Sequence, residues 1–335
     1  MHIYHIHTEN PHCIQKNVYL SFHTLYPQIY MHYFMSYSMT YVITHYQDKF
    51  ITEQVRISTT VTKDWSFYFQ TPADQLQQVY SQPDFDPETR HYCLKDNTMV
   101  GFCTSKIEKE DTERASLEFP LVLPEHRTGE SLLFERAVEV LSQKGVNTIY
   151  TRVSDKWGRT VQMAEKWDYT ATHPLSILYS MDTESIPLPQ IKEEDTVTPY
   201  DHERDFQELV TIFATHFNMT PEEARANFEA LEKAGDTVIA HLVIRNNETI
   251  RARVLALRDE EDSTQARAGA VYVTEPHLLN PLMKSMIKIC KEKGIQTVIV
   301  PLLGDQLAQK ERLIPFYESL GFTHACTIDI YEKHI

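Results

Sequence analysis

The spacing of apolar residues first predicts a helix followed by a strand. Between Ser131 and Leu141 apolar positions recur every three or four residues, as on one face of a helix, and Gly145 follows as a stop signal. Residues 146–153 then predict a strand.

The same unit returns about 149 positions later. Asn280 and Pro281 open a second helix as its N-cap and first helical position, Gly294 ends it, and residues 295–300 predict a strand. A repeat of this length indicates duplicated domains, because a solenoid would repeat every ~20–50 residues.

The elements around each unit also match. Residues 90–103 and 237–257 each predict a hairpin with an Asn/Asp turn, and residues 116–123 and 268–273 each predict a further strand. Helices precede both hairpins, and one of them opens with a capping box at Thr220. A closing helix and a last strand complete each half.

This order predicts the α/β (α+β) class, as two tandem domains that each have a mixed, mostly antiparallel sheet flanked by helices. The domains are expected at residues 57–185 and 186–335. The boundary is expected near residues 185–195, where prolines lie in a polar stretch.

Residues 1–56 differ from the rest and are expected to form a poorly ordered extension, or to precede the true start. They hold 8 of the 18 tyrosines and 7 of the 16 histidines. Residues 17–47 carry no Asp, Glu, Lys or Arg, but polar residues interrupt this run, so membrane contact is not expected. No metal is expected either, because the early histidines keep no ligand spacing: His2, His5, His7 and His12.

Composition and charge narrow the possible partners. Of 335 residues, 32 are Lys or Arg and 47 are Asp or Glu, which gives a formal net charge of −15. Neither half supplies the basic stripe that nucleic acid or an acidic membrane surface requires. An amine-bearing small molecule or peptide suits this surface charge better. Five scattered cysteines without a C-x-x-C pair argue against a disulfide framework or zinc, and indicate a reducing compartment, the cytoplasm.

Two short segments carry a family resemblance. Residues 316–322, with the sequence FYESLGF, resemble the closing helix of the GNAT superfamily of acyl-CoA N-acyltransferases, and residues 122–129 look like its coenzyme A loop. The resemblance covers residues 57–335 as tandem copies. It implies an N-acetyltransferase that transfers an acetyl group from acetyl-CoA to a primary amine by direct attack, with the cofactor in the first copy and no metal.

The resemblance also implies where coenzyme A would bind. A helix N-terminus offers free N–H groups to the pyrophosphate, and glycine permits close backbone approach. Residues 127–131 form this turn one residue short of the family pattern, with Glu130 beside the phosphates. Pro120 is compatible with a splayed strand whose backbone would receive the pantetheine arm. The implied cofactor-binding residues are Leu121, Val122, Leu123, Arg127, Thr128, Gly129, Glu130 and Ser131. The alternative is an ordinary strand-to-helix turn.

Two residues are the catalytic candidates. Glu118, on the strand before the loop, lies where the family commonly has a glutamate, which would act as the base. Tyr317 lies where the family often has its acid, whereas the first copy has Ala164 there. The alternatives are an exposed strand glutamate and a tyrosine that only packs.

The second copy departs further, because residues 276–280 contain no glycine and no arginine, so it is expected to shape the cleft. A competing hypothesis is a degenerate duplicate that serves as a binding or scaffold module. A third is dimerisation through the aromatic-rich extension. The acceptor stays open among small amines, antibiotics, protein N-termini and lysine.

Overall fold

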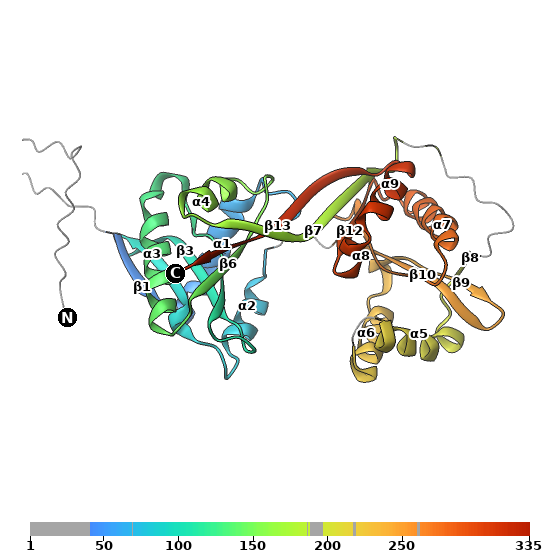
Figure 1. Ribbon diagram of the computed structural model, residues 1–335, viewed down its shortest axis with the longest axis horizontal. Helices are drawn as coiled ribbons and strands as arrows, with labels where there is room; N and C mark the ends of the chain where they lie inside the picture. Colours follow the sequence, from blue (N-terminus) through green and yellow to red (C-terminus); the bar gives the residue numbers. More distant parts are fainter. Residues whose placement is uncertain (1–40, 69, 186, 188–196, 217–218, 260–261) are drawn as a thin grey trace, which may run out of the picture. The chain divides into compact units, whose positions relative to one another are not determined.

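An antiparallel hairpin forms the centre of the first half. Its strands are β2 (Arg90–Lys95) and β3 (Thr98–Ile107). Asp96 and Asn97 join them with positive φ angles of 51° and 64°, as a tight two-residue hairpin turn requires. The remaining elements of this half are β1 (Tyr41–His45), α1 (Ile51–Thr62), α2 (Ala73–Tyr80), β4 (Arg114–Leu117), β5 (Leu121–Val122), α3 (Thr128–Gln143), β6 (Thr148–Val153), α4 (Thr160–Lys166) and β7 (Thr170–Asp182). Figure 1 shows the computed structural model, which describes residues 41–68, 70–185, 187, 197–216, 219–259 and 262–335.

The second half repeats this plan around the hairpin of β9 (Val238–Asn246) and β10 (Thr249–Arg258). Its other elements are β8 (Val197–Pro199), α5 (His202–His216), α6 (Pro221–Lys233), β11 (Gln265–Val273), α7 (Leu279–Glu292), β12 (Thr297–Leu303), α8 (Asp305–Ala308), α9 (Lys310–Ser319) and β13 (Thr323–His334). The predicted capping box is present, since Thr220 and Glu223 bond each other's backbone N–H groups. Gly145 and Gly294 follow α3 and α7 with φ angles of 88° and 75°, which explains the glycine at both stops.

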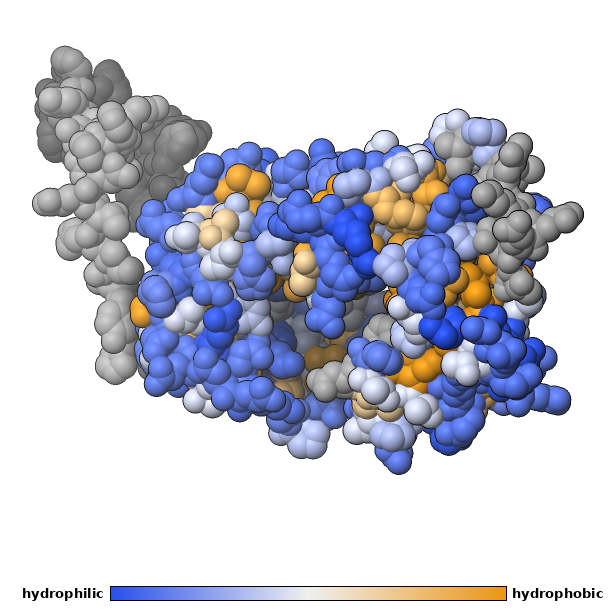
Figure 2. All heavy atoms as spheres, turned by 45° about the vertical axis from the view of Figure 1, so that its right-hand side comes forward, coloured by the Kyte–Doolittle hydropathy of each residue, from blue (hydrophilic) through white to orange (hydrophobic). Residues whose placement is uncertain are grey.

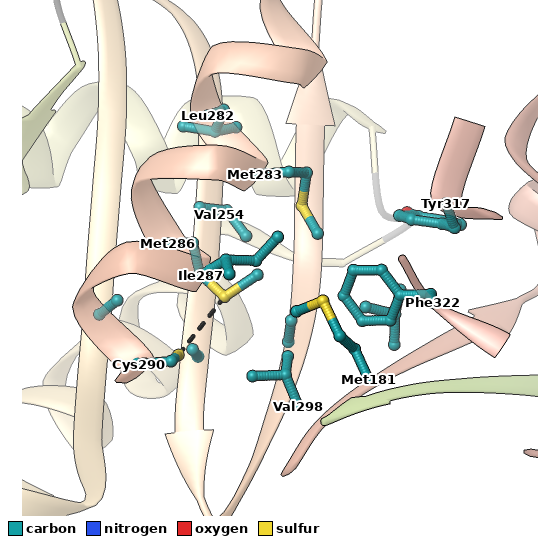
Figure 3. Packing of buried hydrophobic residues seen from close by; sticks show 14 of the residues in the cluster. Met181, Val254, Leu282, Met283, Met286, Ile287, Cys290, Val298, Tyr317 and Phe322 are labelled. Carbon is teal, nitrogen blue, oxygen red and sulfur yellow. Dashed lines mark hydrogen bonds between the residues drawn. The ribbon is translucent and has the colours of Figure 1, made fainter. Parts of the chain in front are cut away.

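Helices cover the two faces of the first-half sheet. Tyr92 and Phe102 pack with Ile57 of α1, whereas their neighbours Cys93 and Cys103 point to the opposite face and pack with α3 and α4. The second half has the same two layers, with α5 and α6 on one face and α7 and α9 on the other. Figure 3 shows the α7 side of this core, in which Met283, Met286 and Ile287 are fully enclosed.

The last strands of the two halves are exchanged. Residues 329–334 of β13 pair with β6, while residues 329–332 also pair with the first part of β7. The second part of β7 pairs with β12 of the second half, as Thr297↔Asp182 to Leu303↔Ser176. Figure 1 shows β7 and β13 side by side over their length. The sheet therefore runs β4-β6-β13-β7-β12-β11, and each half contains a central strand from the other.

Two boundaries differ from the sequence predictions, and two predicted segments lie wholly or partly outside the described residues. Residue 57 lies inside α1, and residues 41–56 supply β1 and the start of α1, so part of the expected extension belongs to the first half. Residues 1–40, with the early histidines, lie outside the described residues, as do residues 186 and 188–196 of the expected linker. The second helix, α7, begins at Leu279 rather than after Asn280, because the 3-10 turn Pro276–Leu278 runs directly into it.

Polar residues dominate the visible surface. Figure 2 shows a mostly hydrophilic face with smaller apolar areas. Among the described residues, no helix combines the length and the apolar character that a bilayer span demands. The described residues also contain no cluster of three His, Cys, Asp or Glu residues suited to a metal ion.

Candidate active site

A β-bulge interrupts the strand that was predicted as continuous over residues 116–123. β4 pairs with β3 in the register Ser105↔Leu117, whereas β5 pairs with β3 as Phe102↔Leu121. The register has shifted by one residue, so Phe119 and Pro120 together face Cys103. Pro120 fits here because the bulge removes the need for its missing N–H. The interruption agrees with the expectation that Pro120 is compatible with a splayed strand.

The bulge lies beside an opening in the sheet. β4 and β6 are parallel and pair at only three positions, of which the last is Ser116↔Tyr150. β5 then pairs with β3 alone, and β6 continues to Val153 against β13. The backbone edges of residues 117–122 and 151–153 therefore face each other across a gap with no ladder between them.

An ion pair spans this opening on the α1 side. Leu117 and Phe119 are buried against α3 and α4, so Glu118 between them points to the other face. Its Oε1 accepts hydrogen bonds from Arg152 Nε at 3.1 Å and Nη2 at 2.8 Å. The carboxylate in turn raises the pKa of the Arg152 guanidinium above its ordinary value. A cavity of about 50 Å³ adjoins this pair, and its other lining residues are Trp65, Tyr68, Phe102, Thr104, Phe119, Leu121, Trp157 and Thr160.

Two buried hydroxyl groups lie at the opening on the opposite face of the sheet, which is covered by α3 and α4. Thr151 is one residue beyond the last β4–β6 pair, and its Oγ1 has no hydrogen-bond partner among the described residues. Tyr169 contacts the ring of Phe119 edge-on at 5.4 Å, and within the same part of the chain its hydroxyl is likewise unpartnered. Burial holds the pKa of this phenol well above its usual range, so the group stays protonated. Unsatisfied buried polar atoms are uncommon and need a reason.

Helix α3 begins just beyond β5. The first-turn N–H groups of Thr128 and Gly129 precede any intrahelical acceptor, and Arg127 beside them is exposed. Gly129 is buried, and a Cβ there would lie 3.0 Å from the Cys93 sulfur, so glycine lets the helix start approach the sheet.

Glu130 forms an ion pair at the start of α3. Its side chain is 7% exposed, and its two oxygens accept bonds from Arg159 Nη1 at 3.0 and 3.2 Å. The charge of the carboxylate is thus offset by Arg159 at the start of α4. Ser131 accepts a bond from Lys166 at 2.7 Å, which adds a second cation near this helix end.

Comparisons with solved structures identify the architecture. A tandem GNAT protein from the clavulanic acid biosynthesis pathway matches with a TM-score of 0.60 at 13% identity, over 88% of this chain and 98% of that one. A GNAT-family acetyltransferase from Colwellia psychrerythraea matches at 0.59 and 17%, over 87% and 99%. A GCN5-related N-acetyltransferase from Sphaerobacter thermophilus matches at 0.59 and 10%, over 88% and 95%. The chain has the tandem GNAT fold. No family model and no curated protein matches its sequence.

The tandem GNAT fold confirms the predicted class and the predicted duplication. It also makes the two halves comparable residue by residue. The β10–β11 pairing shifts register by one between Arg253 and Leu255, and β11 pairs with β12 at three positions, as β4 does with β6. Both halves of the GNAT fold therefore contain a bulge and an opening.

Chemistry distinguishes the two openings. Aligned on these strand pairs, Gly269 takes the place of Glu118 and Pro301 takes that of Arg152, so the second half of the GNAT fold lacks the ion pair. Helix α7 begins with Leu279 and Asn280, where α3 of the first half begins with Thr128 and Gly129.

Tyr317 lies in the second half of this GNAT fold, away from the Glu118 cavity. It is fully buried between Phe316 and Phe322, at ring distances of 5.4 and 5.8 Å, and Figure 3 shows it beside Phe322. Burial raises the pKa of its phenol to about 12, and its hydroxyl has no partner among the described residues. None of the residues lining the Glu118 cavity belongs to the Tyr317 cluster, so the structure does not bring the two catalytic candidates together.

Sequence reasoning missed several residues that this GNAT fold gathers at the opening. Arg152 could have been found from the strand alternation of β6, whose buried positions are Ile149, Thr151 and Val153. The aromatic residues Trp65, Tyr68 and Trp157 come from two connections between elements, where no periodic pattern points to a shared cavity.

Proposed function

We propose that the chain is an acyl-CoA N-acyltransferase that transfers an acetyl group from acetyl-CoA to a primary amine by direct attack, with the cofactor in the first half. The observation that carries this proposal is the opening between β5 and β6. The Glu118 carboxylate lies at this opening on the α1 face of the sheet, and two buried hydroxyls without partners among the described residues, those of Thr151 and Tyr169, lie on the α3–α4 face. The solved structures of similar fold include acetyltransferases, which supports the reaction class.

The described residues fit coenzyme A at the first half. The unpaired edges of residues 121–123 offer backbone groups to the amide-bearing pantetheine arm, as ladder partners would. The N–H groups of Thr128 and Gly129 and the guanidinium of Arg127 would hold the diphosphate, with Ser131 at the rim. Glu130 contributes by fixing Arg159 at this helix end rather than by touching the phosphates.

Glu118 would accept the proton of the attacking ammonium group. Its Oε1 is held by Arg152, and its Oε2 has no hydrogen-bond partner among the described residues, so Arg152 orients the carboxylate and Oε2 can accept a proton. A positioned base of this kind contributes about 10²–10⁴-fold to the rate. Acetyl-CoA itself supplies an activated thioester, so no covalent intermediate on the protein is needed.

Tyr169 is the proton donor that we propose for the departing thiolate. The first half has Ala164 at the position where the resemblance placed a tyrosine, and Tyr317 serves a different core. The Tyr169 hydroxyl lies next to the bulge, and its raised pKa keeps it protonated at neutral pH.

The four described cysteines are free thiols, which supports a reducing compartment and our proposal of the cytoplasm.

A second candidate function is a binding module without catalysis. It is favoured by the small size of the Glu118 cavity, about 50 Å³. This candidate predicts no acetyl transfer in a broad panel of amines, with or without binding of coenzyme A.

Thermal unfolding with coenzyme A tests the proposed function. At a ligand concentration 1,000-fold above Kd, we expect stabilisation of about 4 kcal/mol in the free energy of unfolding. The variant Arg127→Glu should lose most of this shift, because it reverses a charge at the proposed diphosphate site. Arg136→Glu, on the exposed face of the same helix, is the matched control and should keep it. Absence of a shift in the unaltered protein would contradict the cofactor site.

Thiol release from acetyl-CoA, measured across a panel of primary amines, then separates the two functions. Turnover that depends on the amine supports the transferase. A full coenzyme A shift without turnover supports the binding module.

A further inference from the structure

Aromatic residues make up much of the lining of the cavity beside Glu118, and three of them contact one another. Trp65 and Trp157 lie parallel, with an interplanar angle of 8° and ring centroids 6.0 Å apart. Tyr68 stands edge-on to both, at 4.9 Å from Trp65 and 5.3 Å from Trp157. These three residues, which we call the aromatic box, line one part of the cavity, and Glu118 and Arg152 lie in the same lining.

The aromatic box is held in place by specific contacts. The indole N–H of Trp157 donates to the carbonyl of Ser66 at 2.9 Å, which ties the two connections together. Gly158 lies against Trp65, since a Cβ on it would come within 2.6 Å of the indole nitrogen. Phe67 adopts a φ of 59°, a conformation that is strained for a bulky residue and that packing must enforce. The rings are therefore preorganised rather than loosely collapsed.

The size of the cavity limits what it can receive. One water position needs roughly 10–15 Å³ of such volume, so about 50 Å³ admits a few non-hydrogen atoms and no complete peptide or ring system. The occupant is therefore the end of a longer molecule.

The chemistry of the walls selects the kind of end group. The faces of tryptophan and tyrosine attract cations through the ring quadrupole, most strongly when the cation is partly desolvated. Oε2 of Glu118 adds a carboxylate acceptor, while Arg152 donates its bonds to Oε1. A neutral hydroxyl or thiol end could donate one hydrogen bond to this oxygen, but it would gain neither the cation–π attraction nor the charge–charge attraction.

We infer that the aromatic box and Glu118 form the binding site for the alkylammonium head group of the acceptor, on a molecule whose remainder lies outside the cavity. This inference rests on the proposed function, because it describes the acceptor of the same reaction. It assigns Trp65, Tyr68 and Trp157 as specificity-determining residues and places the nitrogen next to its base. A chain terminus or a linear amine fits, whereas an amine flanked by bulky groups does not.

Tryptophan fluorescence of the full chain, without acetyl-CoA, tests this inference. The chain has three tryptophans, and the third, Trp167, is stacked on Phe134 in the α3–α4 core. We expect saturable quenching by n-butylammonium at constant ionic strength, with at least tenfold weaker binding of n-butanol. Trp65→Leu should weaken n-butylammonium binding at least fivefold, and Trp65→Phe should recover part of it. Trp167→Phe is the control and should bind as the unaltered protein does.

Circular dichroism and thermal unfolding establish that each variant is folded, and Tyr68→Leu replaces Trp65→Leu if that variant is not. Equal affinity for n-butylammonium and n-butanol would overturn the inference, as would unchanged binding in folded Trp65→Leu. Because no cofactor is present, failure of the proposed function is a separate result. Ammonium-selective binding without turnover would support the acceptor site but not the transferase activity. Turnover without ammonium selectivity would support the transferase activity and exclude the aromatic box as the acceptor site.

Discussion

A chain that ends at Gly321, and so lacks β13, is expected to lose the folded structure of both halves and not of the second half alone. β13 lies between β6 and β7 in the first half, and its buried residues include Cys326, Ile328 and Ile330. Full burial of an aliphatic side chain contributes about 1.5–3 kcal/mol, and native domains are stable by only ~5–15 kcal/mol. Loss of several such residues and of a central strand exceeds that margin.

Circular dichroism and amide hydrogen exchange measure this effect. The shortened chain should lack slowly exchanging amides in β4 and β6, although every residue of the first half is present. Adding a peptide of residues 322–335 in trans is the control, and it should restore protection in both halves. A shortened chain whose first half still unfolds cooperatively would show that the strand exchange is not needed for its stability.

Glu118→Gln is expected to lower kcat for acetyl transfer about 10²–10⁴-fold, because glutamine keeps the shape of the side chain but cannot accept the ammonium proton. KM for acetyl-CoA should change little, since the carboxylate lies on the face away from α3. Glu125→Gln, in the exposed turn before α3, is the matched control and should leave kcat unchanged.

Steady-state kinetics with the best amine of the panel provides the measurement. Tyr169→Phe should also lower kcat, by less than Glu118→Gln, if its hydroxyl donates the second proton. Equal kcat values for Glu118→Gln and the unaltered protein would remove Glu118 as the base. An unchanged kcat in Tyr169→Phe would exclude Tyr169 as the acid and would leave the proposal for Glu118 as the base unaffected.

The order of elements could be predicted because short local sequence patterns determine it. The glycines after α3 and α7 adopt the positive φ that ends a helix, and the capping box at Thr220 marks a helix start. The partners of the last strands could not be predicted. The alternation within β7 and β13 stays the same whichever strand lies beside them, so nothing in it indicates the exchange.

The site was predictable only in part, for a similar reason. The family resemblance implies Glu118 as a candidate, strand alternation predicts which face it points to, and Pro120 is compatible with the break that the structure shows. The pairing of Glu130 with Arg159 joins residues 29 positions apart, so no local pattern indicates it. The aromatic box comes from two connections, whose conformations depend on tertiary packing.

Amide hydrogen exchange of the full chain with and without acetyl-CoA tests the central claim most directly. The claim is that the cofactor occupies the opening between β5 and β6 and the start of α3. Added protection should be largest in peptides covering residues 117–131 and 150–160, with little change over residues 268–283, the corresponding part of the second half. Protection confined to residues 268–283, or none in either segment, would contradict the account.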